Sequence, residues 1–169
     1  MEKKYELTDI KIEIFDKTLF RIRALRDIEK YGVKKNDLGG YIEKEYNLSQ
    51  SGNAWVAGNA WVYDNARVYD NAWVYGDARV YGNAEVYGNA RVCGDAEIIW
   101  LSKIGSRLGI TTAFRRKDGN IGIKCGCFEG SLDEFAAKVV ETHGDNKYGR
   151  EYKAAIELIK IHFEEENKQ

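Results

Sequence analysis

The chain has 169 residues, and its 26 basic and 27 acidic side chains leave a formal net charge of −1 at pH 7. So small a charge gives no overall field that would recruit duplex nucleic acid or an anionic membrane, so a charged ligand must be held by a local cluster. No apolar run approaches the ~20 residues that cross a bilayer, and the first residues lack the apolar stretch of a signal peptide. The chain has three cysteines, two of them separated by a single residue, and this is not the disulfide framework of a small secreted protein. We therefore expect a cytoplasmic protein.

Residues 1–50 contain short runs of alternating apolar and polar residues, which is the pattern of β-strands. The runs are KYELTD, KIEIF and TLFRIRAL, and the dipeptide DK at 16–17 is a plausible hairpin turn. Gly39 and Gly40 could be mistaken for a phosphate-binding loop. No Lys-Ser or Lys-Thr pair follows them, however, so a tight turn is the simpler interpretation.

Residues 51–98 repeat one hexamer, Tyr-(Gly/Asp)-(Asn/Asp)-Ala-x-Val, eight times. Within each hexamer, Ala-x-Val-Tyr follows the two-residue period of a short strand, which puts Ala and Val on one face and x and Tyr on the other. The next two residues tolerate left-handed or turn backbone, so the chain should bend after each strand. The pattern predicts a coil of strands and corners. Its predicted interior consists of Ala54, Ala60, Ala66, Ala72, Ala78, Ala84, Ala90 and Ala96 with Val56, Val62, Val68, Val74, Val80, Val86, Val92 and Ile98.

The spacing resembles the hexapeptide repeat of left-handed parallel β-helices, in which three hexamers form one triangular turn. The resemblance covers residues 51–98, and the flanking segments EYNLSQ and IWLSKI would extend the coil at both ends. It implies a parallel, left-handed β-helix, and a right-handed or two-sided solenoid is the alternative. Both ends need caps, because an open end presents unpaired backbone and apolar side chains.

A three-sided coil would stack residues that are 18 apart in sequence, about 4.8 Å from each other on neighbouring coils. Opposite charges and aromatic rings would then meet across coils. The expected pairs are Arg79 with Glu97, Arg67 with Glu85, Tyr63 with Tyr81, and Tyr69 with Tyr87.

The remaining side of the coil carries Trp55, Trp73 and Arg91 in one column, with Tyr75 in the next. Ladder packing is the better explanation for the tyrosines, which recur in five of the eight copies. For the tryptophans, an oligomer interface or a ligand platform is as good an explanation as packing.

After the repeats, GITTAFRR and IGIKCGCFEG flank KDGN and predict a hairpin. Ser131 to Glu134 has the spacing of a capping box and opens a helix that Gly144 should end. The segment YGREYKAAIELIKIHFEE predicts a second helix, with Asp145 and Asn146 in the turn between the helices.

Cys125 and Cys127 alternate with two isoleucines on one expected strand face, so they are most simply core residues. With His143 or His162 they could form a zinc site. The Cys-x-Cys spacing lacks the usual two-residue gap, however, and no second pair exists. We therefore expect no metal and no cofactor.

These patterns predict a mainly β fold, built around a parallel, left-handed β-helix. A β-rich N-terminal cap spans 1–50, the hexapeptide-repeat β-helix spans 51–104, and an αβ C-terminal cap of one hairpin and two helices spans 105–169.

The segments RIRAL, DLGGYIE and NLSQ before the repeats, with CGCFEGSLDEF and THGDNKYG after them, resemble a family of small uncharacterised proteins of bacteria, prophages and phages. Phage accessory proteins of this size are often binders that blunt host defence. The resemblance implies a counter-defence protein that sequesters a small anionic ligand, such as a signalling nucleotide. The alternatives are a module that inhibits a host defence protein by gripping it, and a self-assembling β-helix scaffold.

We expect no enzymatic activity. Acyltransferases with hexapeptide repeats place a catalytic histidine on a coil, but both histidines of this chain lie outside the repeats. We expect a homodimer or homotrimer that buries the Trp55 and Trp73 face. A nucleotide would be held by aromatic stacking and by Arg or Lys on phosphate, with Arg115 to Lys117 folded back over the last coil. The predicted ligand-binding residues are Trp55, Trp73, Tyr75, Arg91, Arg115, Arg116, Lys147 and Arg150.

Overall fold

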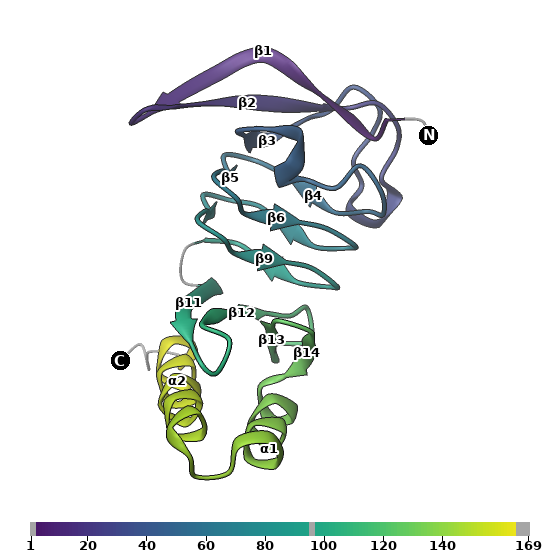
Figure 1. The fold of residues 1–169 in the computed structure, drawn as a ribbon. Coiled ribbons are helices and arrows are strands. Elements are labelled where there is room, and N and C mark those ends of the chain that lie inside the picture. The colour runs from purple at the N-terminus through teal and green to yellow at the C-terminus, as the bar shows by residue number, and fades with distance from the viewer. Residues whose placement is uncertain (1–2, 95–96, 165–169) are drawn as a thin grey trace, which may run out of the picture. The chain divides into compact units, whose positions relative to one another are not determined.

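The computed structural model describes residues 3–94 and 97–164, and the chain divides into two units, 1–95 and 96–169. Strands dominate the first unit, and the second unit combines strands with two helices (Figure 1).

The first unit starts with an antiparallel hairpin of β1 (Tyr5–Ile14) and β2 (Lys17–Ala24). β2 pairs antiparallel with β3 (Leu38–Ile42), which in turn pairs parallel with β5 (Trp61–Val62). The hairpin therefore covers the edge of the first coil, whose backbone groups would otherwise lack a strand partner. Beneath it lie the buried side chains of Tyr5, Leu19, Ile22, Ala24 and Ile28.

Two details of this N-terminal part differ from expectation. The hairpin turn consists of Phe15 and Asp16, one residue before the DK pair. Two short 3-10 helices, η1 (Glu29–Tyr31) and η2 (Glu45–Asn47), lie between the strands.

The repeats form short parallel strands on three sides. Partners on each side are 18 residues apart, as Trp55 and Trp73 are, so the predicted register is confirmed. One side holds β4 (Trp55–Val56), β7 (Trp73–Val74) and β10 (Arg91–Val92); the second holds β5 and β8 (Arg79–Val80); the third holds β6 (Arg67–Val68) and β9 (Glu85–Val86).

The first coil begins before the first hexamer. Tyr41 pairs with Trp61, and Leu48 forms a parallel bridge with Val68, so both pairs are 20 residues apart. Two extra residues are therefore accommodated between Leu48 and Trp55, where the register becomes 18. The segment EYNLSQ does extend the coil, as expected.

Gly39 and Gly40 lie within β3, so the expectation of a tight turn is wrong. A Cβ atom at Gly39 would stand 2.5 Å from the carbonyl oxygen of Val56, and one at Gly40 would stand 2.6 Å from that of Ala60. Glycine is needed here because backbones approach closely, a requirement that the sequence pattern does not reveal.

The predicted interior is confirmed for the coil residues that the structure describes. Every repeat alanine from Ala54 to Ala90 and every repeat valine from Val56 to Val92 is at most 1% exposed. Ala96 lies outside the described residues. The first residue of each corner has positive φ, as the Gly/Asp preference predicts, with 59° at Asp64 and 66° at Gly82.

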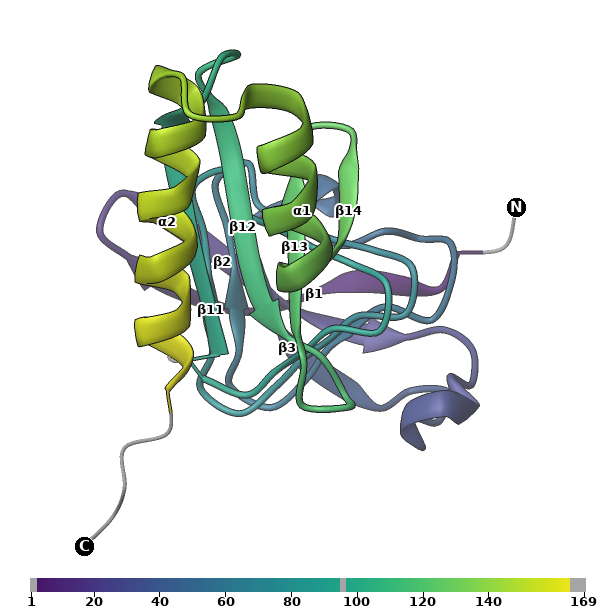
Figure 2. The ribbon, with the colours of Figure 1, turned by 90° about the horizontal axis from the view of Figure 1, so that it is seen from below.

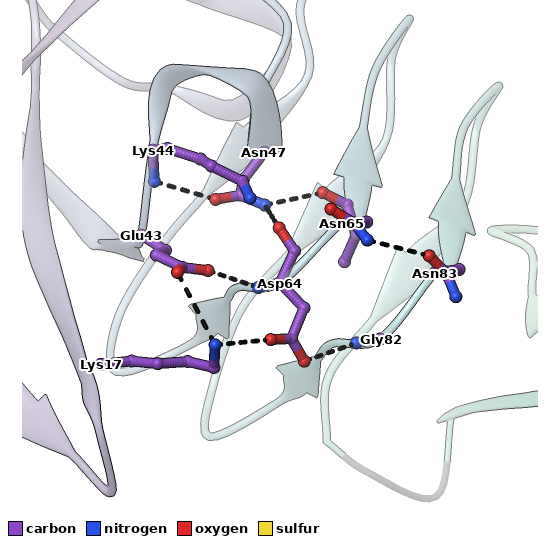
Figure 3. Close-up of polar contacts among 9 residues, drawn as sticks. Lys17, Glu43, Lys44, Asn47, Asp64, Asn65, Gly82 and Asn83 are labelled. Carbon is purple, nitrogen blue, oxygen red and sulfur yellow. Dashed lines mark hydrogen bonds and ion pairs between the residues drawn. The ribbon is translucent and has the colours of Figure 1, made fainter.

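A polar network fastens the N-terminal hairpin to one corner column (Figure 3). The ammonium of Lys17 in β2 lies 2.9 Å from the carboxylate of Asp64 and 3.8 Å from that of Glu43. The second oxygen of Asp64 accepts a hydrogen bond from the backbone N–H of Gly82 at 3.1 Å. The Asn65 side chain donates to that of Asn83 at 3.2 Å, so amides also stack along the column.

The second unit begins differently from expectation. We expected the coil to continue to residue 104, but Ile98–Ile104 forms β11, which pairs antiparallel with β12 (Gly109–Arg115). β13 (Ile121–Cys125) and β14 (Phe128–Ser131) complete an antiparallel four-stranded sheet. Ile98 is therefore a strand residue of this sheet, and the IWLSKI segment forms most of β11.

Both predicted helices are present, on one face of the sheet (Figure 2). α1 (Leu132–His143) starts with the predicted capping box, in which the Ser131 hydroxyl and the Glu134 carboxylate each accept a backbone N–H of the other residue. α2 (Lys147–Phe163) is capped by Asn146, whose side chain accepts two backbone N–H groups. The core between the helices and the sheet consists of Ala113, Ile123, Leu132, Phe135, Val139, Tyr152, Ile156, Ile159 and Phe163.

Candidate functional site

The tryptophan column on the coil exists, but its first member is not a surface residue. Trp55 and Arg91 both pair with Trp73, as the register predicts. Trp55 is only 1% exposed and makes an edge contact with Tyr5, with ring centroids 6.5 Å apart. The N-terminal hairpin thus covers this ring, and the expectation that Trp55 forms part of an exposed ligand platform is wrong.

Trp73 lies in an aromatic cluster that we define as Tyr31, Trp73, Tyr75 and Arg91. Its ring stacks on Tyr31 at 4.9 Å and on Tyr75 at 4.4 Å, and the Arg91 guanidinium lies 5.3 Å from the ring centroid. A base could stack on Trp73 only by displacing one of these groups. Tyr31 comes from η1, outside the repeats, so the repeat pattern gives no signal for its place in the cluster.

The other expected pairs on the coil have mixed outcomes. Tyr63 stacks on Tyr81 at 5.1 Å and Tyr69 on Tyr87 at 5.5 Å, so both tyrosine ladders are confirmed. Arg67 does lie opposite Glu85, and its guanidinium lies over the rings of Tyr46 and Tyr69.

Glu97 and Arg79 each have another partner. Glu97 pairs with Arg115 at 3.3 Å within the second unit. The guanidinium of Arg79 lies 4.7 Å from the ring centroid of Trp61 in the first unit.

Two arginines of the predicted phosphate-binding segment are engaged in internal contacts. Besides its pairing with Glu97, Arg115 donates to the carbonyl oxygen of Phe163 at 3.0 Å. Arg116 donates to the carbonyl oxygen of Gly130 at 2.8 Å. The Arg115 guanidinium therefore joins β12 to the end of α2, and the Arg116 guanidinium joins the β12–β13 turn to β14.

Lys147 and Arg150 lie in the first turn of α2, beside the interhelical turn. The Arg150 guanidinium donates to the carbonyl oxygen of Asp145 at 2.8 Å, and the Lys147 ammonium lies over the ring of Tyr148. The expected turn at Asp145 and Asn146 is confirmed.

The second unit contains a cavity of about 420 Å³ that the sequence did not predict. It lies among the β11–β12 turn, the β13–β14 turn, α1 and the start of α2. Its lining residues are Ser106, Arg107, Gly109, Cys125, Gly126, Cys127, Phe128, Phe135, Lys138, Val139, Thr142, His143 and Tyr152.

Aromatic rings form much of the cavity wall. The Tyr152 ring meets Phe135 edge to face at 5.5 Å and stacks on His143 at 5.7 Å. Phe128 lies 5.2 Å from Phe135. These contacts hold the rings in place, so the wall is largely preformed.

Two polar groups in the wall are already engaged. The Cys125 thiol accepts a hydrogen bond from the Thr111 hydroxyl at 3.2 Å and lies 3.6 Å from the hydroxyl of Tyr152. Burial, reinforced by the hydrogen bond with Cys125, raises the pKa of Tyr152 well above its usual range. The phenol therefore stays protonated at physiological pH.

The charged groups that line the cavity are basic. Arg107, in the β11–β12 turn, and Lys138, on α1, are both exposed and carry the formal charges. No Asp or Glu occurs among the described residues that line the cavity, although Glu141 pairs with Lys138 at 3.0 Å. An anionic group is therefore favoured beside these two cations.

The sequence pattern gives no signal for this cavity, because its lining residues come from separate segments and each segment has the pattern of an ordinary turn, strand or helix. Gly105, which precedes the lining residue Ser106, has φ of 73°, and a Cβ there would stand 1.9 Å from the Tyr152 hydroxyl. Glycine at a turn is common, and its contact with a tyrosine 47 residues later has no local signal.

The structure does not support the alternative of a zinc site. Cys127 lies in the β13–β14 turn and is exposed, so it does not alternate with Cys125 on one strand face. Within the described ranges, no group of three or more His, Cys, Asp or Glu side chains is arranged to hold a metal ion.

Comparisons with known proteins bear on the coil alone. Residues 60–76 match the family described as the YdcK β-solenoid repeat. No curated protein matches the chain. None of the helices in the described part of the chain is both long and apolar enough to span a membrane. Together, the match and the stacked parallel strands identify the chain as a β-solenoid repeat protein.

Proposed function

We propose that this chain is a non-catalytic binding protein that holds a small anionic ligand, such as a signalling nucleotide, in the cavity of the second unit. The observation that carries the proposal is the pairing of an aromatic wall with two basic side chains and no acidic one among the lining residues. Nucleotides are commonly held by aromatic contact to the base and by Arg or Lys on phosphate.

The size and character of the cavity fit this ligand class. A volume of about 420 Å³ lies within the range of small-molecule sites, which are mostly apolar with a few polar groups that fix orientation. Phe128, Phe135 and Tyr152 would contact an aromatic body. Arg107 and Lys138 would contact its phosphate or carboxylate.

The proposal that the chain is not an enzyme rests on the state of the polar groups in this wall. Tyr152 is held protonated by burial, so it is a poor general base. The thiol of Cys125 is hydrogen-bonded to Thr111 and lies next to the hydroxyl of Tyr152, which stays protonated and is therefore a poor base for it.

A biological context follows from the resemblance of the repeats and their flanks to phage and bacterial proteins. We place the protein in the cytoplasm of a host cell, as a phage or prophage counter-defence protein that sequesters its ligand. Its three free cysteines suit a reducing compartment. For the repeats themselves, the resemblance favours a left-handed β-helix of the hexapeptide type.

Thermal-shift screening tests the proposal. The probes are nucleoside monophosphates, cyclic mono- and dinucleotides and ADP-ribose, combined with mass spectrometry of small molecules that co-purify. We expect at least one nucleotide to raise the melting temperature of the wild type and not that of an Arg107→Glu/Lys138→Glu variant. Lys117→Glu, an exposed change elsewhere in the second unit, is the matched control and should respond like the wild type. If no nucleotide shifts the wild type and none co-purifies, the proposal fails.

A second candidate is a module that grips a host protein. The aromatic cluster favours it, because Trp73 and Tyr75 are half-buried and combine with Arg91, a set of residue types enriched at protein interfaces. This function predicts partner loss on Trp73→Ala and no small-molecule ligand. A pull-down that depends on Trp73, with no nucleotide response, would favour it.

A further inference from the structure

The outer edge of β1 is open to another strand. β1 is the last strand of its five-stranded sheet, with β2 as its one strand neighbour (Figure 1). An edge strand presents backbone N–H and C=O groups that can pair with a further strand. At the start of β1 the edge is occupied, because the side chain of Gln50 bonds the backbone of Lys4 and Tyr5. Further along, no described residue of the first unit is paired with this edge.

Only a short stretch of this edge is regular. Three residues, Thr8 to Ile10, lie opposite a single residue of β2, so β1 bulges between Leu7 and Lys11. The hydroxyl of Thr8 accepts the N–H of Ile10 within the bulge at 3.2 Å. Regular pairing resumes at Lys11 and runs to Ile14. Because the bulge interrupts the ladder and Gln50 occupies the start of β1, the regular stretch that is open to a further strand is 11–14.

The hairpin turn determines which backbone groups of this stretch point outward. Ile14 and Lys17 close a two-residue turn and form a hydrogen-bonded pair. Hydrogen-bonded and non-hydrogen-bonded pairs alternate along an antiparallel ladder. The backbone groups of Lys11 and Glu13 therefore point away from β2. Both side chains are exposed, and neither has a hydrogen bond or ion pair within the described chain.

We infer that two copies of this chain pair through β1, antiparallel across a two-fold axis at Ile12, with Lys11 of each copy opposite Glu13 of the other. Pairing about Lys11 or about Glu13 would instead set like charges directly opposite each other, which is unfavourable. Pairing about Ile12 joins both Lys-Glu pairs and brings the two Ile12 side chains together.

This interface closes on itself. The same edge is used by both copies, so pairing consumes it and leaves no second β1 edge for a third copy. The other end of the sheet is β8, whose strand is two residues long. The interface therefore predicts a dimer and no filament. It replaces the tryptophan face, which the hairpin partly buries, and does not depend on the proposed ligand.

A series of charge-swap variants tests this dimer, with the dimer affinity measured by analytical ultracentrifugation over a range of protein concentrations. We expect the wild type to dimerise, and Lys11→Glu and Glu13→Lys each to weaken the dimer about tenfold, because each creates two like-charge pairs. The double variant Lys11→Glu/Glu13→Lys should restore the wild-type affinity, since it re-creates both pairs with reversed sign. Lys117→Glu carries the same charge change as Lys11→Glu and should dimerise like the wild type. A monomeric wild type, single variants that dimerise normally, or a double variant that stays weak would each overturn the inference.

A cross-linking readout checks the register itself in a Cys93→Ser/Cys127→Ser background. Across the proposed axis the two Ile12 residues form a non-hydrogen-bonded pair with Cα atoms about 4.5 Å apart, which a disulfide can bridge. Ile12→Cys should therefore cross-link on mild oxidation and Ile10→Cys should not. Equal cross-linking of both variants, or of neither, would rule out this register.

Discussion

The carboxylate of Asp64 accepts a hydrogen bond from the backbone N–H of Gly82, the equivalent corner residue one coil later, at 3.1 Å (Figure 3). Asp70 makes the same contact with Gly88 at 3.4 Å. Both aspartates have positive φ, 59° and 58°, at corners where most repeats have glycine. The side-chain bond offsets the cost of left-handed backbone for a residue with a Cβ. This explains why the repeats accept Gly or Asp at this position.

Asp64→Ala should destabilise the protein by about 2 kcal/mol, because it removes the bonds to Lys17 and Gly82 but keeps the unfavourable backbone. Asp64→Gly loses the same bonds yet relieves the backbone, so it should cost about 1 kcal/mol less than Asp64→Ala. Denaturant unfolding of the two variants beside the wild type measures both differences. An alanine variant as stable as the glycine variant would show that backbone strain has no part in the choice of residue.

Asp64 should also make stability depend on pH. Burial alone would raise the pKa of Asp64, but the hydrogen bonds from Lys17 and from the Gly82 N–H outweigh burial and lower it below its ordinary 3.8. A lowered folded-state pKa gives stability that is present above the unfolded value and is lost as the pH falls through the folded value. The stability difference between wild type and Asp64→Asn should therefore shrink on acidification below pH 4. A difference that stays constant with pH would contradict this assignment.

Lys4 should make the stability of the protein depend on pH in the alkaline range. The side chain is fully buried, and its nitrogen donates to the carbonyl oxygen of Ala54 at 2.7 Å. Burial, with a smaller contribution from the charge of Arg26, lowers the pKa of Lys4 from 10.5 to about 7. Between these two values the unfolded chain binds more protons than the folded chain, so stability should rise with pH, by at most about 1.4 kcal/mol per pH unit.

Lys4→Met removes this titration while keeping a long side chain. The difference in unfolding free energy between wild type and Lys4→Met should move in favour of the wild type as pH rises above 7. Urea unfolding at several alkaline pH values measures it. Parallel curves for the two proteins would mean that Lys4 titrates normally in the folded state.

Gly105 should be far less replaceable than another turn glycine. A Cβ at Gly105 would stand 1.9 Å from the Tyr152 hydroxyl, whereas a Cβ at Gly119 would meet nothing within 4 Å, although both residues have positive φ. Gly119→Ala should cost about 1 kcal/mol for backbone conformation alone, and Gly105→Ala about 3 kcal/mol or more. Thermal unfolding of the two variants gives the comparison, and equal costs would show that Tyr152 moves aside without penalty.

The coil was largely predictable because its information is periodic. One hexamer determines which residues face inward, and the 18-residue offset then places Tyr63 on Tyr81 without knowledge of the rest of the chain. Trp55 is buried, contrary to the prediction, because a hairpin from outside the repeats covers it, and no local pattern encodes that packing. Gly39 and Gly40 resemble a turn in the sequence because a tight turn and a close approach of two backbones both require glycine.

The candidate site was not predictable for the same physical reason. Arg107, Phe135 and Tyr152 line one cavity through tertiary packing of a turn and two helices, and each residue is unremarkable in its own segment. The residues that the sequence did favour, such as Arg115 and Arg116, turned out to hold internal ion-pair and carbonyl contacts. A sequence shows that basic residues are clustered, but it does not show which of them are bound to other groups of the protein.

Calorimetric titration with the nucleotide that gives the largest thermal shift tests the central claim most directly, because it asks which part of the chain holds the ligand. Arg107→Glu alters the cavity, and Arg91→Glu alters the aromatic cluster by the same charge change. We predict that Arg107→Glu weakens binding at least about tenfold, the expected loss for a charge-assisted contact, and that Arg91→Glu binds like the wild type. Unchanged binding by Arg107→Glu together with loss in Arg91→Glu would contradict the account and move the site to the coil.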